Sequence, residues 1–167
     1  MVLLSTGASA VAFKPNESKL IVLAVSQILD MHHFLGHKID DEIAAKHLKF
    51  MIDRLDYVHM IFQQSDVDKF REDYGTSLDE EVKEGKVEPA NVIFKRFLKR
   101  LNAATNQVGK LLKQDFDFTE KERFQPDRHK LGWPKMEADS DELWRLRIKY
   151  ELLNGILAGD EDQETRN

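Results

Sequence analysis

The stretch from residue 55 to residue 70 constrains the fold most, because its pattern predicts two consecutive helices that meet at one residue. Leu55, Val58 and Phe62 recur at steps of three and four, which places an apolar stripe along one side of a helix. Ser65 then stands where an N-cap belongs, since its hydroxyl can accept a backbone N–H and acidic residues follow in the next turn. We therefore expect one helix to end before Ser65 and a second to begin there.

The rest of the chain also carries helical patterns, and no strand pattern or internal repeat interrupts them. Asn16 is a plausible cap for a long helix that Gly36 ends, and Asp40 opens the next helix. Ser77 can cap a short acidic turn, and the longest regular pattern begins at Glu88. The sequence thus predicts helices in quick succession.

Two long helical segments carry complementary apolar surfaces. The first has a coiled-coil-like seam with alternating steps of four and three, made of Phe94, Leu98, Leu101, Thr105, Val108 and Leu112. The second, from Asp139 or Ser140 to about Ala158, has two adjacent seams, Leu143, Leu146, Tyr150, Leu153 and Leu157 in one and Trp144, Ile148, Leu152 and Ile156 in the other. We expect these helices to pack side by side in the core. Residues 115–134 are expected to be an ordered connection packed over the bundle, anchored by Phe116, Phe118, Phe124 and Trp133.

Length and composition fit one soluble helical domain. The chain has 167 residues, 41% of them hydrophobic, which suffices for a single core. We predict an all-α, single-domain bundle of five to seven helices without significant sheet, with a helical domain over residues 13–159 and an acidic tail or link over residues 160–167. The net charge of −5 argues against a general nucleic-acid binder, and the lack of cysteine excludes disulfides, thiolate metal sites and cysteine nucleophiles.

Two residue clusters invite a chemical interpretation that the sequence does not favour. Ser65 and Lys69 lie four apart and can form a nucleophile and its base, but a capping serine has its oxygen occupied, and Asp66 and Asp68 would keep the lysine protonated. His32, His33 and His37 are spaced for zinc, but Gly36 is expected to end the helix between them and no third ligand accompanies them. We predict no catalytic, cofactor-binding or metal-binding residue in this chain.

Three further features have a structural and a functional interpretation. His59 lies beside the apolar stripe and is expected to have a hydrogen-bonded packing role. A basic patch on the long helix can bind an anionic surface or an acidic partner, or be neutralised by the acidic residues just upstream; it consists of Lys95, Arg96, Lys99 and Arg100. Trp133 and Trp144 can line a peptide groove, although fastening the last helix to the connection is the simpler role.

Several ordered motifs resemble one protein family. The stretch LDYVHMIFQQSDVDKF is similar to a Leu-Asp-Tyr-x-His…Ser-Asp-Val-x-x-Phe signature in the N-terminal helical region of bacterial tail-specific proteases, also called C-terminal processing peptidases. The segments DFDF, DRHKLGWPK and DELWRLRIKYELL follow that family's pattern in the same order, with Glu142, Leu143 and Trp144 at the start of the last helix. The resemblance extends from the first expected helix to Leu157.

The resemblance implies a non-catalytic part of a larger serine protease. In that family this region precedes a PDZ module and a protease domain with a catalytic serine and lysine, and neither catalytic residue can be placed on this sequence. We expect both domains to follow Asn167, with this region helping to form the substrate cavity, position the PDZ module or bind an adaptor or second subunit. The alternative is a free-standing helical interaction module.

The family resemblance also bears on the start of the chain. Residues 1–12 are small and apolar, and Ala10 and Ala12 form part of a small-x-small pattern typical of signal-peptide cleavage sites. The segment is either a flexible start or a signal-peptide remnant, because a basic n-region is lacking. The family's periplasmic location favours the remnant. Beyond the expected PDZ and protease domains, the implied partners are protein substrates and a protein adaptor, with no nucleic acid and no integral membrane segment.

Overall fold

The computed structural model describes residues 19–25 and 41–164, and the helices below refer to that part of the chain. It contains six helices and no strand, which confirms the all-α prediction. A short helix covers residues 19–25, inside the first helix that the sequence predicts. The others are α2 (Asp41–Leu55), α3 (Gln64–Tyr74), α4 (Leu78–Lys83), α5 (Glu88–Leu111) and α6 (Glu137–Glu164).

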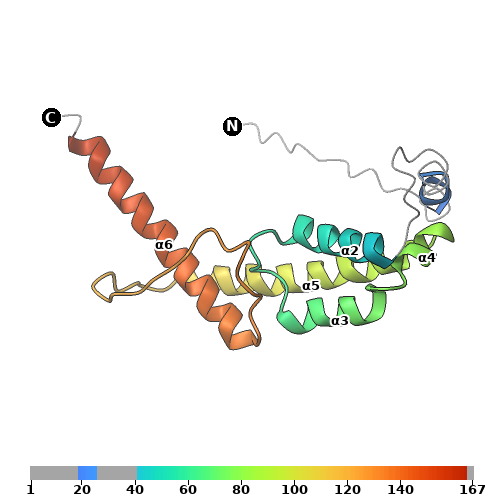
Figure 1. The fold of residues 1–167 in the computed structure, drawn as a ribbon. Helices are drawn as coiled ribbons and strands as arrows, with labels where there is room; N and C mark the ends of the chain where they lie inside the picture. Colours follow the sequence, from blue (N-terminus) through green and yellow to red (C-terminus); the bar gives the residue numbers. More distant parts are fainter. Residues whose placement is uncertain (1–18, 26–40, 165–167) are drawn as a thin grey trace, which may run out of the picture.

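The body of the domain is formed by α2, α3, α4 and α5, and α6 crosses one end of α5 (Figure 1). Helix α2 packs on α3 and α4, α3 packs on α5, and α5 packs on α6. In α2 the buried side chains recur at steps of four, which gives the helix one apolar face. The core cluster consists of Ala44, Leu48, Ile52, Phe62, Val67, Phe70, Leu78 and Ile93.

The segment between α2 and α3 differs from the prediction. Helix α2 ends at Leu55, and residues 56–63 form a non-helical connection instead of continuing the helix. Phe62 of the expected stripe is fully buried in the core, while Tyr57, which would lie beside that stripe on a helix, is exposed. The helical prediction was wrong here because a side-chain carboxylate accepts the backbone N–H groups that a further helical turn would have paired.

The start of α3 corrects a second prediction. The N-cap is Gln63, and the exposed Ser65 lies inside the first turn. Asp66 accepts the Gln63 backbone N–H at 3.1 Å, which supplies the reciprocal half of a capping box. The negative charge expected at the start of this helix is therefore confirmed, but the capping serine was wrong.

Helix α5 pairs with α6 as predicted, but it buries a different face. Its buried residues are Pro89, Ile93, Ala104 and Leu111. In the predicted seam, Phe94 is 49% exposed and Leu98 is 41% exposed. The ring of Phe97, 5.9 Å from that of Phe62, turns the neighbouring face toward the core. Thr105 and Leu112, at 60% exposure for the leucine, are also exposed. The predicted core role of the seam was therefore wrong for four of its six residues, and only Leu101 and Val108 are partly buried.

Helix α6 is longer than predicted. It begins at Glu137, where the Asp139 carboxylate accepts the N–H groups of Lys135 and Met136 at 3.2 Å, and it continues to Glu164. Its first half packs against α5 and buries Leu143, whereas its second half extends away from the body (Figure 1). The expectation that this helix packs in the core was wrong for the second half, whose exposed apolar residues are Leu152, Leu153, Ile156 and Leu157.

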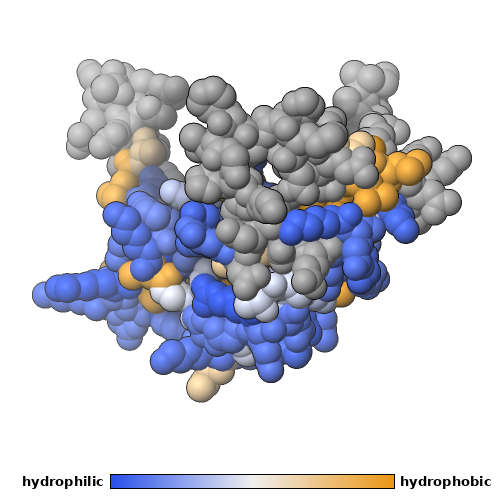
Figure 2. All heavy atoms as spheres, turned by 45° about the vertical axis from the view of Figure 1, so that its right-hand side comes forward, coloured by the Kyte–Doolittle hydropathy of each residue, from blue (hydrophilic) through white to orange (hydrophobic). Residues whose placement is uncertain are grey.

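Two of the four predicted aromatic anchors of the connection between α5 and α6, Phe124 and Trp133, are confirmed. The ring of Phe124 lies 5.4 Å from that of Tyr150, and Trp133 packs against the core cluster. Phe118 remains 40% exposed, although the ammonium of Lys149 lies 5.9 Å from its ring. Hydrophilic residues cover most of the described surface on the face in Figure 2, and hydrophobic residues gather in a few patches.

Candidate functional site

The connection after α2 is organised by one buried carboxylate. Asp56 accepts the backbone N–H groups of Met60 at 2.9 Å, Ile61 at 3.0 Å and Phe62 at 2.9 Å. It also accepts the indole N–H of Trp133 at 3.0 Å. One side chain therefore holds both the 56–63 connection and the segment before α6. This brings together two of the motifs that carry the family resemblance, Leu-Asp-Tyr and Trp-Pro-Lys.

His59 completes this junction. It adopts a left-handed backbone conformation with φ of 54°, and its buried ring stacks on Trp133 with centroids 3.7 Å apart. Its Nδ1 bonds the carbonyl oxygen of Leu131, so Nδ1 carries the proton and donates. The predicted hydrogen-bonded packing role of His59 is confirmed. The carbonyl of Pro134 accepts the N–H of Gln64 at 2.8 Å, which ties the same segment to the start of α3.

A second buried carboxylate joins α3 to α5. Asp66 accepts a bidentate pair from Arg100, with Nε to Oδ2 at 2.7 Å and Nη2 to Oδ1 at 3.1 Å. The same guanidinium donates to Gln63 Oε1 at 2.8 Å, and Arg96 lies 3.6 Å from Asp66. Half of the predicted basic patch is thus neutralised within the fold. The partner is Asp66, not the acidic residues upstream of α5.

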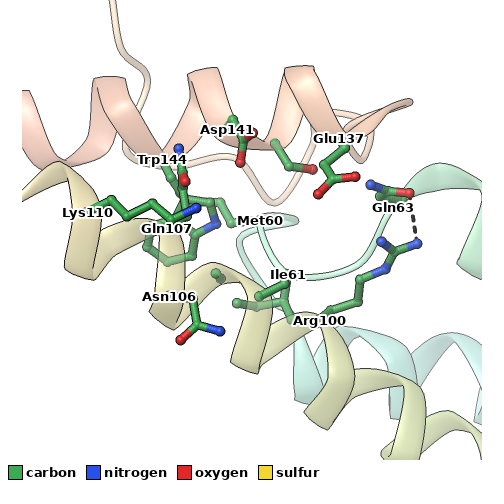
Figure 3. Close-up of a pocket in the computed structure, with 13 residues that line it drawn as sticks. Met60, Ile61, Gln63, Arg100, Asn106, Gln107, Lys110, Glu137, Asp141 and Trp144 are labelled. Carbon is green, nitrogen blue, oxygen red and sulfur yellow. Dashed lines mark hydrogen bonds between the residues drawn. The ribbon is translucent and has the colours of Figure 1, made fainter.

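A pocket of about 250 Å³ lies beside this junction, between the 56–63 connection, α5 and α6 (Figure 3). Arg100 and Gln63 form one side, and Glu137 and Asp141 of α6 face them. Trp144 lies toward the Lys110 end of the pocket. The lining is mixed in charge and includes the amides of Asn106 and Gln107. Such a surface can hydrogen-bond a polar group. The hydroxyl of Ser140, which also lines the pocket, donates to the carbonyl of Met136 at 3.5 Å and not to a side-chain base.

The Ser65 and Lys69 pair has the wrong electrostatics for catalysis. Lys69 donates to Asp73 at 2.7 Å and lies 3.6 Å from Glu72. The hydrogen bond to Asp73 and the negative charges of Asp73 and Glu72 raise the pKa of Lys69. A catalytic base requires a lowered lysine pKa. The expected protonated state is supported, although its cause is the following turn of α3 and not the flanking Asp66 and Asp68.

An ion-pair network fastens the connection to α6. Glu122 contacts both Arg145 and Lys149, and Arg145 also donates to Glu142 at 2.7 Å. Hydrogen bonds from Arg145 and Lys149 lower the pKa of Glu122 to about 2. Arg147 adds a contact 5.8 Å above the ring of Phe124. The first half of α6 is therefore held by charges as well as by apolar packing.

Metal and membrane interpretations find no support in the described part of the chain. Across residues 19–25 and 41–164, no group of three or more histidine, cysteine or acidic side chains is arranged to hold a metal ion. His32, His33 and His37 lie outside the described residues. In the same ranges, no helix is both long enough and apolar enough to cross a membrane.

The sequence interpretation missed Asp56, Gln63 and the pairing of Asp66 with Arg100. Asp56 stands directly after the apolar pattern of α2, where a helix end leaves backbone groups to be satisfied, and this is the signal that could have identified it. The Asp66–Arg100 pair joins residues 34 apart, and helical periodicity contains no information on such a contact.

Two comparisons place the chain among known proteins. The family model described as the tail specific protease N-terminal domain matches residues 25–167. The Tail-specific protease of Haemophilus influenzae is 33% identical over 138 residues, which cover 83% of this chain and 20% of that protein. The chain thus spans about 20% of the length of the curated relative it matches.

Proposed function

Because the chain belongs to the tail-specific protease N-terminal domain family, we propose that it positions the PDZ module and protease domain of a periplasmic serine protease through α6. The domain itself is non-catalytic. Peptide-bond cleavage is assigned to a serine and lysine pair in the protease domain, outside this chain. The raised pKa of Lys69 supports this division, since the helical domain's own serine and lysine pair has no available base.

The second half of α6 is the observation that carries this proposal. Leu153 is 38% exposed and Leu157 is 54% exposed, and Leu152 and Ile156 are exposed on the adjacent face. Contiguous apolar surface of this kind marks an interaction site. A relative five times as long as the matched region has ample chain to cover it. Docking on α6 would set the position of the following domains relative to the helical body.

The test uses the complete protease expressed from the full reading frame. Leu153→Glu is expected to lower cleavage of an unfolded protein with an apolar C-terminus and to lower the melting temperature of the protease. Asn154→Glu, on the same exposed turn, is the matched control and should change neither. In the 167-residue chain alone, Asn154→Glu should melt as the parent does, and Leu153→Glu should lower the melting temperature by less than it does in the full protease. Unchanged activity and stability of the full protease carrying Leu153→Glu would refute the role of α6.

Three simpler experiments bear on the family-level part of the proposal. If the natural reading frame encodes a stop directly after Asn167, the chain is a free-standing interaction module and the proposal is refuted. The 167-residue chain should not cleave the unfolded substrate, and cleavage that disappears in Ser65→Ala would show a catalytic role for that serine. Osmotic-shock release of the full protease from cells tests the periplasmic location.

A further inference from the structure

The outward face of α5 combines exposed apolar residues with coiled-coil spacing. We call Phe94, Leu98 and Leu101 the outer seam; they follow each other at steps of four and three. Phe94 and Leu98 are 49% and 41% exposed, and Leu101 is half-buried. Steps of four and three place side chains in register to receive the side chains of a second helix. The fully buried residues of α5 lie on a different face of the helix.

Two lysines border the outer seam on one side. Lys95 and Lys99 each follow a seam residue and are exposed. Among the contacts of the described residues, neither has an ion-pair partner, whereas Arg96 and Arg100 on the adjacent face both pair with Asp66. The patch therefore divides into a half neutralised by the fold and a half whose charge is available.

We propose that the outer seam docks an amphipathic helix of a separate protein, with apolar residues at four-three spacing and acidic residues along one edge. The spacing selects a helix, and the two lysines select its acidic edge. An anionic lipid surface is less suited, because a protein of net charge −5 with two available lysines gains only about 1 kcal/mol for each of them at a membrane. The proposal is independent of the role of α6, which uses a different helix.

The first experiment measures binding of two designed peptides to the 167-residue chain by fluorescence anisotropy. Both peptides have leucine at the seam positions over three heptads and lactam bridges on the outer face that keep them helical. One carries glutamate along one edge, and the other carries lysine along the same edge. We expect the acidic peptide to bind at least tenfold more tightly, and this preference should shrink at high salt. Equal binding of the two peptides, or no binding, overturns the proposal.

Charge reversal then tests whether the outer seam is the site. The double variant Lys95→Glu/Lys99→Glu should bind the acidic peptide about tenfold more weakly and the basic peptide more tightly. The reason is that two attractions to the acidic peptide become repulsions. Lys121→Glu, which reverses an exposed lysine outside the seam, is the matched control and should leave both affinities unchanged. Leu98→Ser should lower the affinity for both peptides. A preference that persists after the double reversal places the binding elsewhere and overturns the proposal.

Two further measurements distinguish other occupants. Concentration-dependent dimerisation in sedimentation that Leu98→Ser abolishes would identify a second copy of this chain as the occupant. Binding to phosphatidylglycerol vesicles that Leu98→Ser abolishes would identify a membrane surface. Either result overturns the proposal. Because all the substituted side chains are exposed, circular dichroism should show parent-like folding, and the lysine reversal remains an independent test if Leu98→Ser fails to fold.

Discussion

Replacing Asp56 by alanine would remove the acceptor of four hydrogen bonds at once. Two of these bonds come from the buried backbone N–H groups of Met60 and Phe62. The other two donors, the Ile61 N–H and the Trp133 indole, are partly accessible, so water can replace the carboxylate there. A buried donor left without an acceptor costs about 1–3 kcal/mol, so the two buried donors together cost about 2–6 kcal/mol. Domains of this size have about 5–15 kcal/mol of stability, so the loss is large.

Asp56→Asn provides a graded comparison. Oδ2 accepts three of the four bonds, and Oδ1 accepts the N–H of Met60. An asparagine can place its oxygen at the Oδ2 position and keep three bonds, but its amino group then faces the Met60 N–H. We therefore expect Asp56→Asn to cost about 1–3 kcal/mol, the penalty of one unsatisfied buried donor, and Asp56→Ala to cost more.

Urea unfolding followed by far-ultraviolet circular dichroism and tryptophan fluorescence measures both variants. Asp68→Ala, which removes an exposed carboxylate in the next helix, is the matched control and should change the free energy of unfolding by less than about 0.5 kcal/mol. Fluorescence of Trp133 should shift toward that of a solvated indole in the folded Asp56→Ala protein. If Asp56→Ala is no less stable than Asp68→Ala, the four bonds are not the organising contacts of this junction.

Three further predictions concern stability. Ser65→Ala should change the free energy of unfolding by less than about 0.5 kcal/mol, because Gln63 and not Ser65 is the N-cap; a loss of 1 kcal/mol or more, about the cost of a lost cap, would contradict this. Ile93→Ala should cost about 2–5 kcal/mol because Ile93 is fully buried, and Leu153→Ala, at a 38% exposed site, should cost clearly less; equal melting temperatures would contradict this. The lowered pKa of Glu122 means that its ion pairs stabilise the fold above its ordinary pKa of 4.5 and lose that contribution as the pH falls toward about 2. Urea midpoints measured across this window should fall more steeply for the parent than for Glu122→Gln, and parallel curves would refute it.

The number, order and type of the helices follow from periodicity, because each helix must bury one apolar side. The existence of α5 and α6 and their pairing were predicted for this reason. The face of α5 that is buried was not predicted, because Ile93 and Phe94 are neighbours, are both apolar and lie about 100° apart around the helix. The choice between them depends on long-range contacts, such as that of Phe97 with Phe62, which no local pattern contains.

The 56–63 connection shows a different limit of sequence interpretation. Its apolar residues have helical spacing, yet the buried Asp56 offers three backbone N–H groups an acceptor outside the helix. Short acidic side chains compete in this way with helical hydrogen bonding. The effect is visible only when the carboxylate is buried, and the indole of Trp133, 77 residues away, helps to bury it. Neither the aspartate nor the tryptophan alone indicates the junction.

The shape of α6 makes it a lever arm. From the buried Leu143 to the end at Glu164 the helix is about 32 Å long, so that a rotation of about 10° at the base displaces its tip by about 6 Å. The rotation is resisted by contacts near the base, where Glu122 bridges Arg145 and Lys149. Small errors in packing at this base are magnified along the arm. The stiffness of a few ion pairs and ring contacts at the base therefore determines how precisely a segment attached to the tip is positioned.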